Sequence, residues 1–198
     1  VGSEMCIRDS QWDTLLDQLT FNEMVNTITL GFHNTAAIES IGKTRTKDEN
    51  GPQGLTAALT GGASAMCYTS EDVMAATFNV DLINDVGRCI GEDCLAMGYS
   101  GLYGPGINMH RTAYSGRNFE YYASDPFVAG TICAAEVNGI QSKGVYVYLK
   151  HVALNDSESS RRGVNTWLNE QAAREIYLEV ADKAITDGGA WSVMTGFN

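Results

Sequence analysis

The stretch GVYVYLKHVALNDSESSR, residues 144–161, contains the feature that decides the fold. Valine and leucine alternate with tyrosine over residues 145–149, which is the period-two pattern of a β-strand. The apolar run then ends on Lys150 and His151, and a polar loop follows. In parallel α/β folds functional groups gather at the carboxyl ends of strands, so this pair indicates a site as well as a strand.

Strands and helices alternate along the rest of the chain. We expect helices over 12–19, 20–28, 79–98, 125–142 and 168–186, strands over 63–68, 101–109, 144–149 and 190–198, and loops over 40–64 and 152–166. Thr20 and Glu23 have the spacing of a capping box, and Asp125 followed by Pro126 is a helix-start signal. In the helix that begins at Asn79, four apolar residues have roughly helical spacing: Leu82, Val86, Ile90 and Met97.

This order of elements predicts βαβ units and a parallel sheet. A complete (β/α)8 barrel needs about 250 residues, whereas the chain has 198. We therefore predict an α/β fold, a partial TIM-type (β/α)8 barrel with about five of its strands present.

Composition excludes several kinds of partner. The chain is 44% hydrophobic, enough for one substantial core, and its net charge of −11 argues against nucleic acid and anionic membranes. No apolar run approaches the roughly 20 residues of a membrane span. Five cysteines without a CxxC motif predict buried free thiols rather than a metal site. We expect a neutral small-molecule substrate, no cofactor and a cytoplasmic location.

The first ten residues, VGSEMCIRDS, lack the apolar region of a signal peptide. Residues 5–10 resemble one reading frame of a transposon-type sequencing adapter. We therefore interpret residues 1–10 as a non-native leader and residues 11–198 as the N-terminal part of a barrel domain.

Two further stretches add candidate side chains to the pair at 150–151. Met109-His110-Arg111 follows the strand expected over 101–109, so a second strand also ends in cationic groups. Residues 116–122, GRNFEYY, combine arginine, asparagine and glutamate with three aromatic rings. Aromatic faces beside polar groups suit a sugar ring. The cationic strand ends are equally compatible with phosphate, and Lys150 alone is compatible with Schiff-base chemistry or with a solvent-directed side chain.

Three ordered blocks resemble the barrel domain of glycoside hydrolase family 3, especially its β-glucosidase-like branch. They are GPGINMHRTAYSGRNFEYYASDP (104–126), GIQSKGVYVYLKHVALNDSESSR (139–161) and WSVMTGFN (191–198). The family pattern Lys-His-Phe, Asn, Glu, Arg is matched by Lys150, His151, Asn155, Glu158 and Arg161, with Val152 in the phenylalanine place.

The resemblance implies a retaining β-glycosidase, in which an aspartate attacks the anomeric carbon and a glutamic acid protonates the leaving oxygen. It also implies that the substrate is a small β-glycoside and that particular side chains bind it. These side chains are Asp48, Arg117, Lys150, His151, Arg161 and Met194.

The sequence departs from the family pattern at several positions. The nucleophilic aspartate is expected beyond Asn198 and the acid/base glutamate cannot be placed, so we expect these 198 residues to be inactive alone. Phe197 stands where the family has tyrosine. Asn50 stands where the family has aspartate before Gly-Pro, so either Asp48 takes that role by a shift or the sugar is held more weakly.

Alternatives to a β-glucosidase remain open. The whole protein could be a β-xylosidase-like member of the same family, or a carbohydrate-binding protein without catalysis. The hexosaminidase-like branch is disfavoured, because the loop at 152–162 lacks the Asp-His pair of that branch.

Overall fold

The computed structural model describes residues 9–57 and 60–197, and the chain divides into two compact units at Lys47/Asp48. Most of the expected leader, residues 1–8, therefore lies outside the described part. The first unit contains α1 (Asp9–Leu16), α2 (Phe21–Thr29), β1 (Asn34–Thr35), a 3-10 turn (Glu39–Ile41) and the start of β2 (Thr46–Asn50). β1 pairs antiparallel with the start of β2. The capping box at Thr20 and Glu23 is confirmed.

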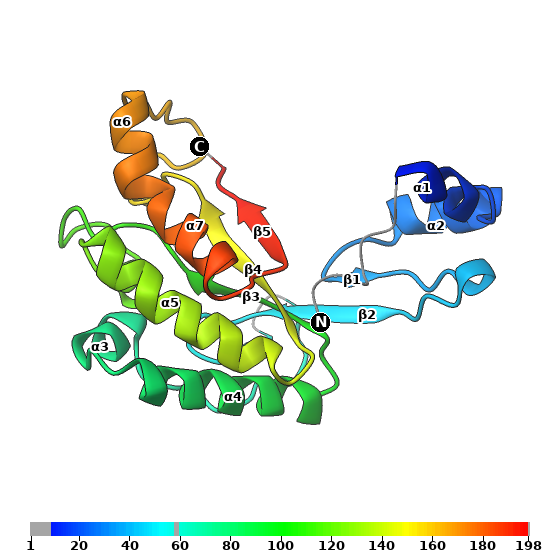
Figure 1. Ribbon diagram of the computed structural model, residues 1–198, viewed down its shortest axis with the longest axis horizontal. Coiled ribbons are helices and arrows are strands. Elements are labelled where there is room, and N and C mark those ends of the chain that lie inside the picture. The colour runs from blue at the N-terminus through cyan, green and yellow to red at the C-terminus, as the bar shows by residue number, and fades with distance from the viewer. Residues whose placement is uncertain (1–8, 58–59, 198) are drawn as a thin grey trace. The chain divides into compact units, whose positions relative to one another are not determined.

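The second unit is a parallel sheet with helices packed against it (Figure 1). The end of β2 pairs with β3 (Gly101–Gly106), β3 pairs with β4 (Tyr146–Val152), and β4 pairs with β5 (Ser192–Thr195). The helices are α3 (Glu71–Ala76), α4 (Val80–Ala96), α5 (Pro126–Gln141), α6 (Glu170–Ala172) and α7 (Glu179–Thr186), and α5 packs between α4 and α7. With β1, five strands are described, four of them parallel, which confirms the prediction of a partial α/β barrel.

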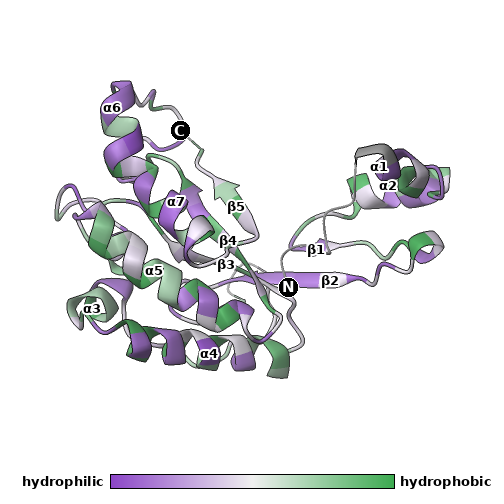
Figure 2. Cartoon of the chain, in the orientation of Figure 1, coloured by the Kyte–Doolittle hydropathy of each residue, from purple (hydrophilic) through white to green (hydrophobic). Residues whose placement is uncertain are grey.

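Two sequence predictions about strands were wrong. Residues 40–64 were expected to be a loop but contain β2, whose sequence TKDEN has no apolar residue and appears hydrophilic in Figure 2. Pairing with β3 explains the last three residues of this strand, because Asp48–Asn50 are the register partners of residues 101–103. Residues 63–68 were expected to be a strand but join no ladder.

The helix predictions were closer to the structure. Asn79 and Asp125 cap α4 and α5 through bonds of 3.0 Å from Leu82 N–H and 2.8 Å from Val128 N–H. Leu82 is 47% exposed, however, and the buried face of α4 contains Ile83, Gly87, Ile90, Gly91 and Cys94. The helix expected over 168–186 is interrupted by a π-turn at Ala173–Tyr177.

The core lies between β3–β5 and the helices. β4 buries Val147 and Leu149 completely, and α5 buries Cys133, Val137 and Ile140 opposite them. Cys94 is also buried, as predicted for free thiols, whereas Cys67 and Cys89 are exposed. Across the described residues, no helix combines the length and the apolar character that crossing a membrane requires.

Candidate functional site

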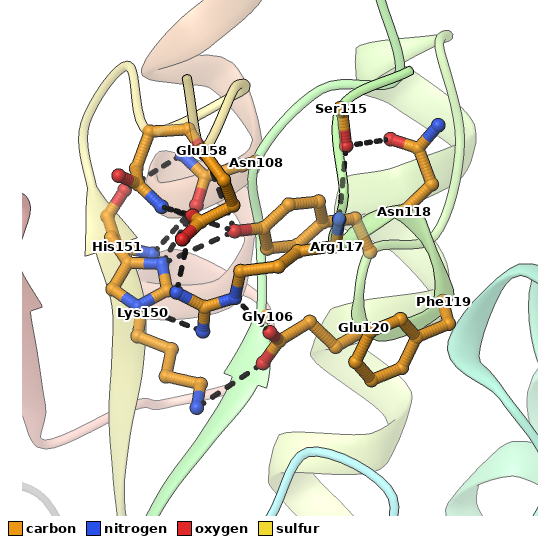
Figure 3. Close-up of polar contacts among 12 residues, drawn as sticks. Gly106, Asn108, Ser115, Arg117, Asn118, Phe119, Glu120, Lys150, His151 and Glu158 are labelled. Carbon is orange, nitrogen blue, oxygen red and sulfur yellow. Dashed lines mark hydrogen bonds and ion pairs between the residues drawn. The ribbon is translucent and has the colours of Figure 1, made fainter. Parts of the chain in front are cut away.

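The carboxyl ends of β3 and β4 bring several polar side chains together (Figure 3). Gly106, the last residue of β3, is the register partner of Lys150 near the end of β4. The loop after β3 returns through a 3-10 turn, Asn118–Glu120, which places Arg117 and Glu120 beside the same strand end. We call Arg117, Glu120, Lys150, His151 and Glu158 the strand-end cluster.

Lys150 is held from two sides and is only 3% exposed. Its ammonium nitrogen lies 3.2 Å from Glu120 Oε2 and donates to Asn50 Oδ1 at 2.7 Å. Burial lowers the pKa of Lys150, and the Glu120 carboxylate works against that effect. The solvent-directed interpretation of Lys150 is therefore wrong: the side chain is part of a buried ion pair.

The ring of His151 is buried between an acceptor and a donor, and it stays neutral. Its Nδ1 lies 3.0 Å from Asn108 Oδ1 and its Nε2 lies 3.2 Å from Arg117 Nη2. Because Asn108 Oδ1 can only accept and the guanidinium can only donate, the ring carries its proton on Nδ1. Burial, together with the positive charges of Arg117 and Lys150, lowers the pKa of His151 to about 3. The expectation of a second cation at this strand end is corrected.

Arg117 links the two sides of the cluster. Its guanidinium makes ion pairs with Glu120 and, at 3.4 Å, with Glu158 Oε1. Glu158 Oε2 in turn lies 2.8 Å from Arg161 Nη1, beside a hollow of about 470 Å³ that is lined by Glu158, Arg161 and their neighbours at 160, 162 and 163. Both carboxylates of the cluster are thus paired with cations: Glu120 with Arg117 and Lys150, and Glu158 with Arg117 and Arg161.

The remaining predicted site residues lie at different distances from this cluster. Met194 on β5 is the register partner of Lys150 and is half-buried. Asn155 donates to Glu158 Oε1 at 3.1 Å, which joins the loop after β4 to the cluster.

Asp48 is not brought to the cluster. Its carboxylate accepts hydrogen bonds from the hydroxyls of Tyr146 and Tyr148, and its register partner is Gly101, the first residue of β3. Gly101 and Gly106 are separated by about 16 Å along the strand, at roughly 3.3 Å per residue. Of the two candidates considered for the first loop, Asn50 and not Asp48 reaches Lys150.

Sequence reasoning missed two members of this arrangement. Glu120 lay within the aromatic segment at 116–122 but was not singled out, and only its ion pairs with Lys150 and Arg117 reveal its part. Asn108 is the last residue of the segment GIN within the strand expected over 101–109. Its side-chain amide forms hydrogen bonds with both the backbone and the ring of His151. Polar residues directly after a predicted parallel strand are the signal that would have found Asn108.

Comparison with known proteins identifies the family. The family model described as "Glycosyl hydrolase family 3 N terminal domain" matches residues 21–198. The chain belongs to glycoside hydrolase family 3. A β-glucosidase from Rhizobium radiobacter is 34% identical over 189 residues, and thermostable β-glucosidase B from Acetivibrio thermocellus is 33% identical over 193; these cover 94% and 93% of this chain.

Solved structures of family members agree with this assignment. β-Glucosidase 3B from Thermotoga neapolitana, solved with glycerol, superposes with a TM-score of 0.82 over 94% of this chain at 31% identity. A Kluyveromyces marxianus β-glucosidase in complex with glucose gives 0.86 over 94% at 31% identity. The chain spans 23% and 26% of the two curated relatives and 29% and 23% of the two solved chains, about a quarter in each case.

Proposed function

We propose that the whole protein containing this chain hydrolyses β-glycosides, β-glucosides foremost, with retention of configuration. The observation that carries the proposal is the strand-end cluster, in which Arg117, Lys150 and the neutral His151 gather at the end of β4 in a family 3 domain. Family membership and β-glucosidase relatives at 33–34% identity support it.

The cluster supplies binding and orientation. Sugar hydroxyls accept hydrogen bonds from ammonium and guanidinium groups, and each such bond contributes about 1.5–3 kcal/mol. Glu120 and Glu158 hold these donors in place before a sugar arrives, so less freedom is lost on binding. Asn50 accepts from Lys150 through Oδ1, which leaves its amide N–H₂ as a further donor group.

The reaction itself requires two carboxyl groups, one as nucleophile and one as acid/base. Glu120 and Glu158 do not suit either role, because each is already paired with cations. In the proposed mechanism the strand-end cluster holds the sugar while an aspartate attacks the anomeric carbon. Its donors hold the hydroxyls of the ring, and such hydrogen bonds strengthen as the ring distorts in the transition state.

Hydrolysis assays with the whole protein test the proposal. We expect turnover of aryl β-glucosides in preference to β-xylosides, with the β-anomer as the first product by NMR. Inverted product would contradict the retaining mechanism, and a preference for xylosides would favour the β-xylosidase alternative. Sugar binding without turnover would identify a carbohydrate-binding protein. Trapping of an adduct on Lys150 with borohydride would instead show Schiff-base chemistry.

A further inference from the structure

Two buried glutamates lie behind the strand-end cluster, and the glycosidase mechanism uses neither. Glu71 is the first residue of α3 and Glu136 belongs to the third turn of α5. Both are 0% exposed. A buried carboxylate without a cation is costly, so each of these side chains requires an explanation.

Glu71 completes the backbone hydrogen bonding of β3. Strand β2 ends at Asn50 opposite Tyr103, so beyond that point β3 has no strand on this side. The N–H of Gly106 donates to Glu71 Oε1 at 3.0 Å in place of a strand partner. The next residue, Ile107, donates its N–H to the carbonyl of Lys150 at 2.6 Å. Glu71 therefore helps to hold the strand end that carries Lys150.

The Tyr122 hydroxyl donates to Glu136 Oε2 at 2.6 Å. Glu136 Oε1 and Glu71 Oε2 are both buried and have no hydrogen-bond partner among the described residues. The positive charge that acts on Glu71 is that of Lys150, whose ammonium group is already bonded to Glu120 and Asn50. Because α3 packs against α5, two negative charges would lie in one buried region, and no cation of the described chain forms an ion pair with either.

We propose that Glu71 and Glu136 form a buried pair that holds one proton between them and anchors Gly106 at the end of β3. One proton removes the repulsion between the two carboxyl groups and leaves an oxygen free to accept the Gly106 N–H. Glu71 is thus a positioning residue for the strand end. The proposal goes beyond the glycosidase activity and does not depend on it.

The charged neighbours of the pair agree with this assignment. Burial raises the pKa of Glu71 well above its usual range, and Glu136 and Glu120 raise it further, whereas the Gly106 N–H and Lys150 work to lower it. Burial raises the pKa of Glu136 to about 7, against the bond from Tyr122. The pKa values of the Cys133 thiol and the Tyr122 hydroxyl are raised as well, chiefly by burial and further by the charges of Glu71 and Glu136.

Infrared spectroscopy of the chain tests the shared proton directly. We expect the carbonyl stretching band of a protonated carboxylic acid at pH 6, which disappears as the pH is raised above 7. The pH at which the band disappears should fall in both Glu71→Gln and Glu136→Gln, because the repulsion between two carboxyl groups is removed while burial still acts on the one that remains. Glu49→Gln is the matched control, since Glu49 is equally buried but accepts from the Asn50 N–H and the Thr60 hydroxyl. It should leave the band unchanged.

The Gly106 amide reports the anchoring role. Its proton signal in NMR should shift with pH at the midpoint of the infrared band, and in Glu136→Gln the shift should move to the lower midpoint of that variant. Glu71→Gln should keep Gly106 protected from hydrogen exchange, because its amide oxygen still accepts, whereas Glu71→Leu should reduce protection at least 10-fold. Absence of the band at pH 6, or a Gly106 amide signal that does not change at the midpoint of the band, would overturn the proposal.

Discussion

The ammonium nitrogen of Lys150 lies 3.2 Å from Glu120 Oε2, and these side chains are only 3% and 6% exposed. Removing one partner of a buried pair leaves an uncompensated charge, which costs about 3–5 kcal/mol. We expect Glu120→Gln to lower the free energy of unfolding at pH 7 by about that amount, measured by urea denaturation. Lys150→Met in the Glu120→Gln background should recover part of the loss. Strictly additive effects in this double-mutant cycle would show that the pair is not coupled.

Gly106 is predicted to tolerate no side chain. A Cβ at this position would lie 1.8 Å from the backbone oxygen of Glu120, so the turn that carries Glu120 must move. We expect Gly106→Ala to destabilise the chain by at least about 1–3 kcal/mol, the usual cost of overpacking. The control is Gly163→Ala, where a Cβ has nothing within 4 Å. Equal midpoints of thermal unfolding for the two variants would contradict this expectation.

The sequence predicted the strand end at Lys150 because its signal is local. Val145, Val147 and Leu149 are buried and alternate with the half-buried Tyr146 and Tyr148, and the polar residues begin where the apolar run stops. The caps at Asn79 and Asp125 were predictable for the same reason, since a cap bonds a backbone N–H only three residues away.

Features that depend on distant partners could not be read from the sequence. β2 is polar throughout and is a strand because other strands pair with it: β1 at its start, and β3 at its end, 53 residues further along at Asp48↔Gly101. The choice between Asp48 and Asn50 was open for a similar reason. Two tyrosine hydroxyls of β4 engage Asp48, and that contact spans about a hundred positions of sequence.

The low pKa of His151, about 3, predicts sensitivity to acid. In the unfolded chain a histidine titrates near 6.5, so the unfolded state binds the proton more readily than the folded state. The stability from neutral His151 is therefore present above pH 6.5 and is lost as the pH falls toward 3. We expect the free energy of unfolding to fall over this window, by an amount on the order of a few kcal/mol.

His151→Gln should reduce this acid sensitivity, because glutamine cannot be protonated. His110→Gln removes a histidine outside the strand-end cluster, bonded instead to the Asn118 carbonyl, and serves as the control. Urea unfolding at pH 7, 5 and 4 measures the three proteins. If the free energy of unfolding of His151→Gln falls with decreasing pH as steeply as that of the wild type, the loss of stability arises from other groups.

Kinetics of the whole protein separate the roles of Lys150 and His151. Lys150 offers a charge-assisted hydrogen bond, worth about 1.5–3 kcal/mol. Neutral His151 donates to Asn108 and accepts from Arg117, so its replacement affects the sugar through the position of Arg117 and costs less, about 0.5–1.5 kcal/mol. On an aryl β-glucoside we therefore expect kcat/KM to fall about 10- to 150-fold in Lys150→Met and about 2- to 10-fold in His151→Gln. Part of each loss should appear in kcat, because hydrogen bonds to the hydroxyls of the sugar strengthen in the distorted transition state. Unchanged kcat/KM in both variants, with folding confirmed by circular dichroism, would remove the reason for placing the sugar at this strand end.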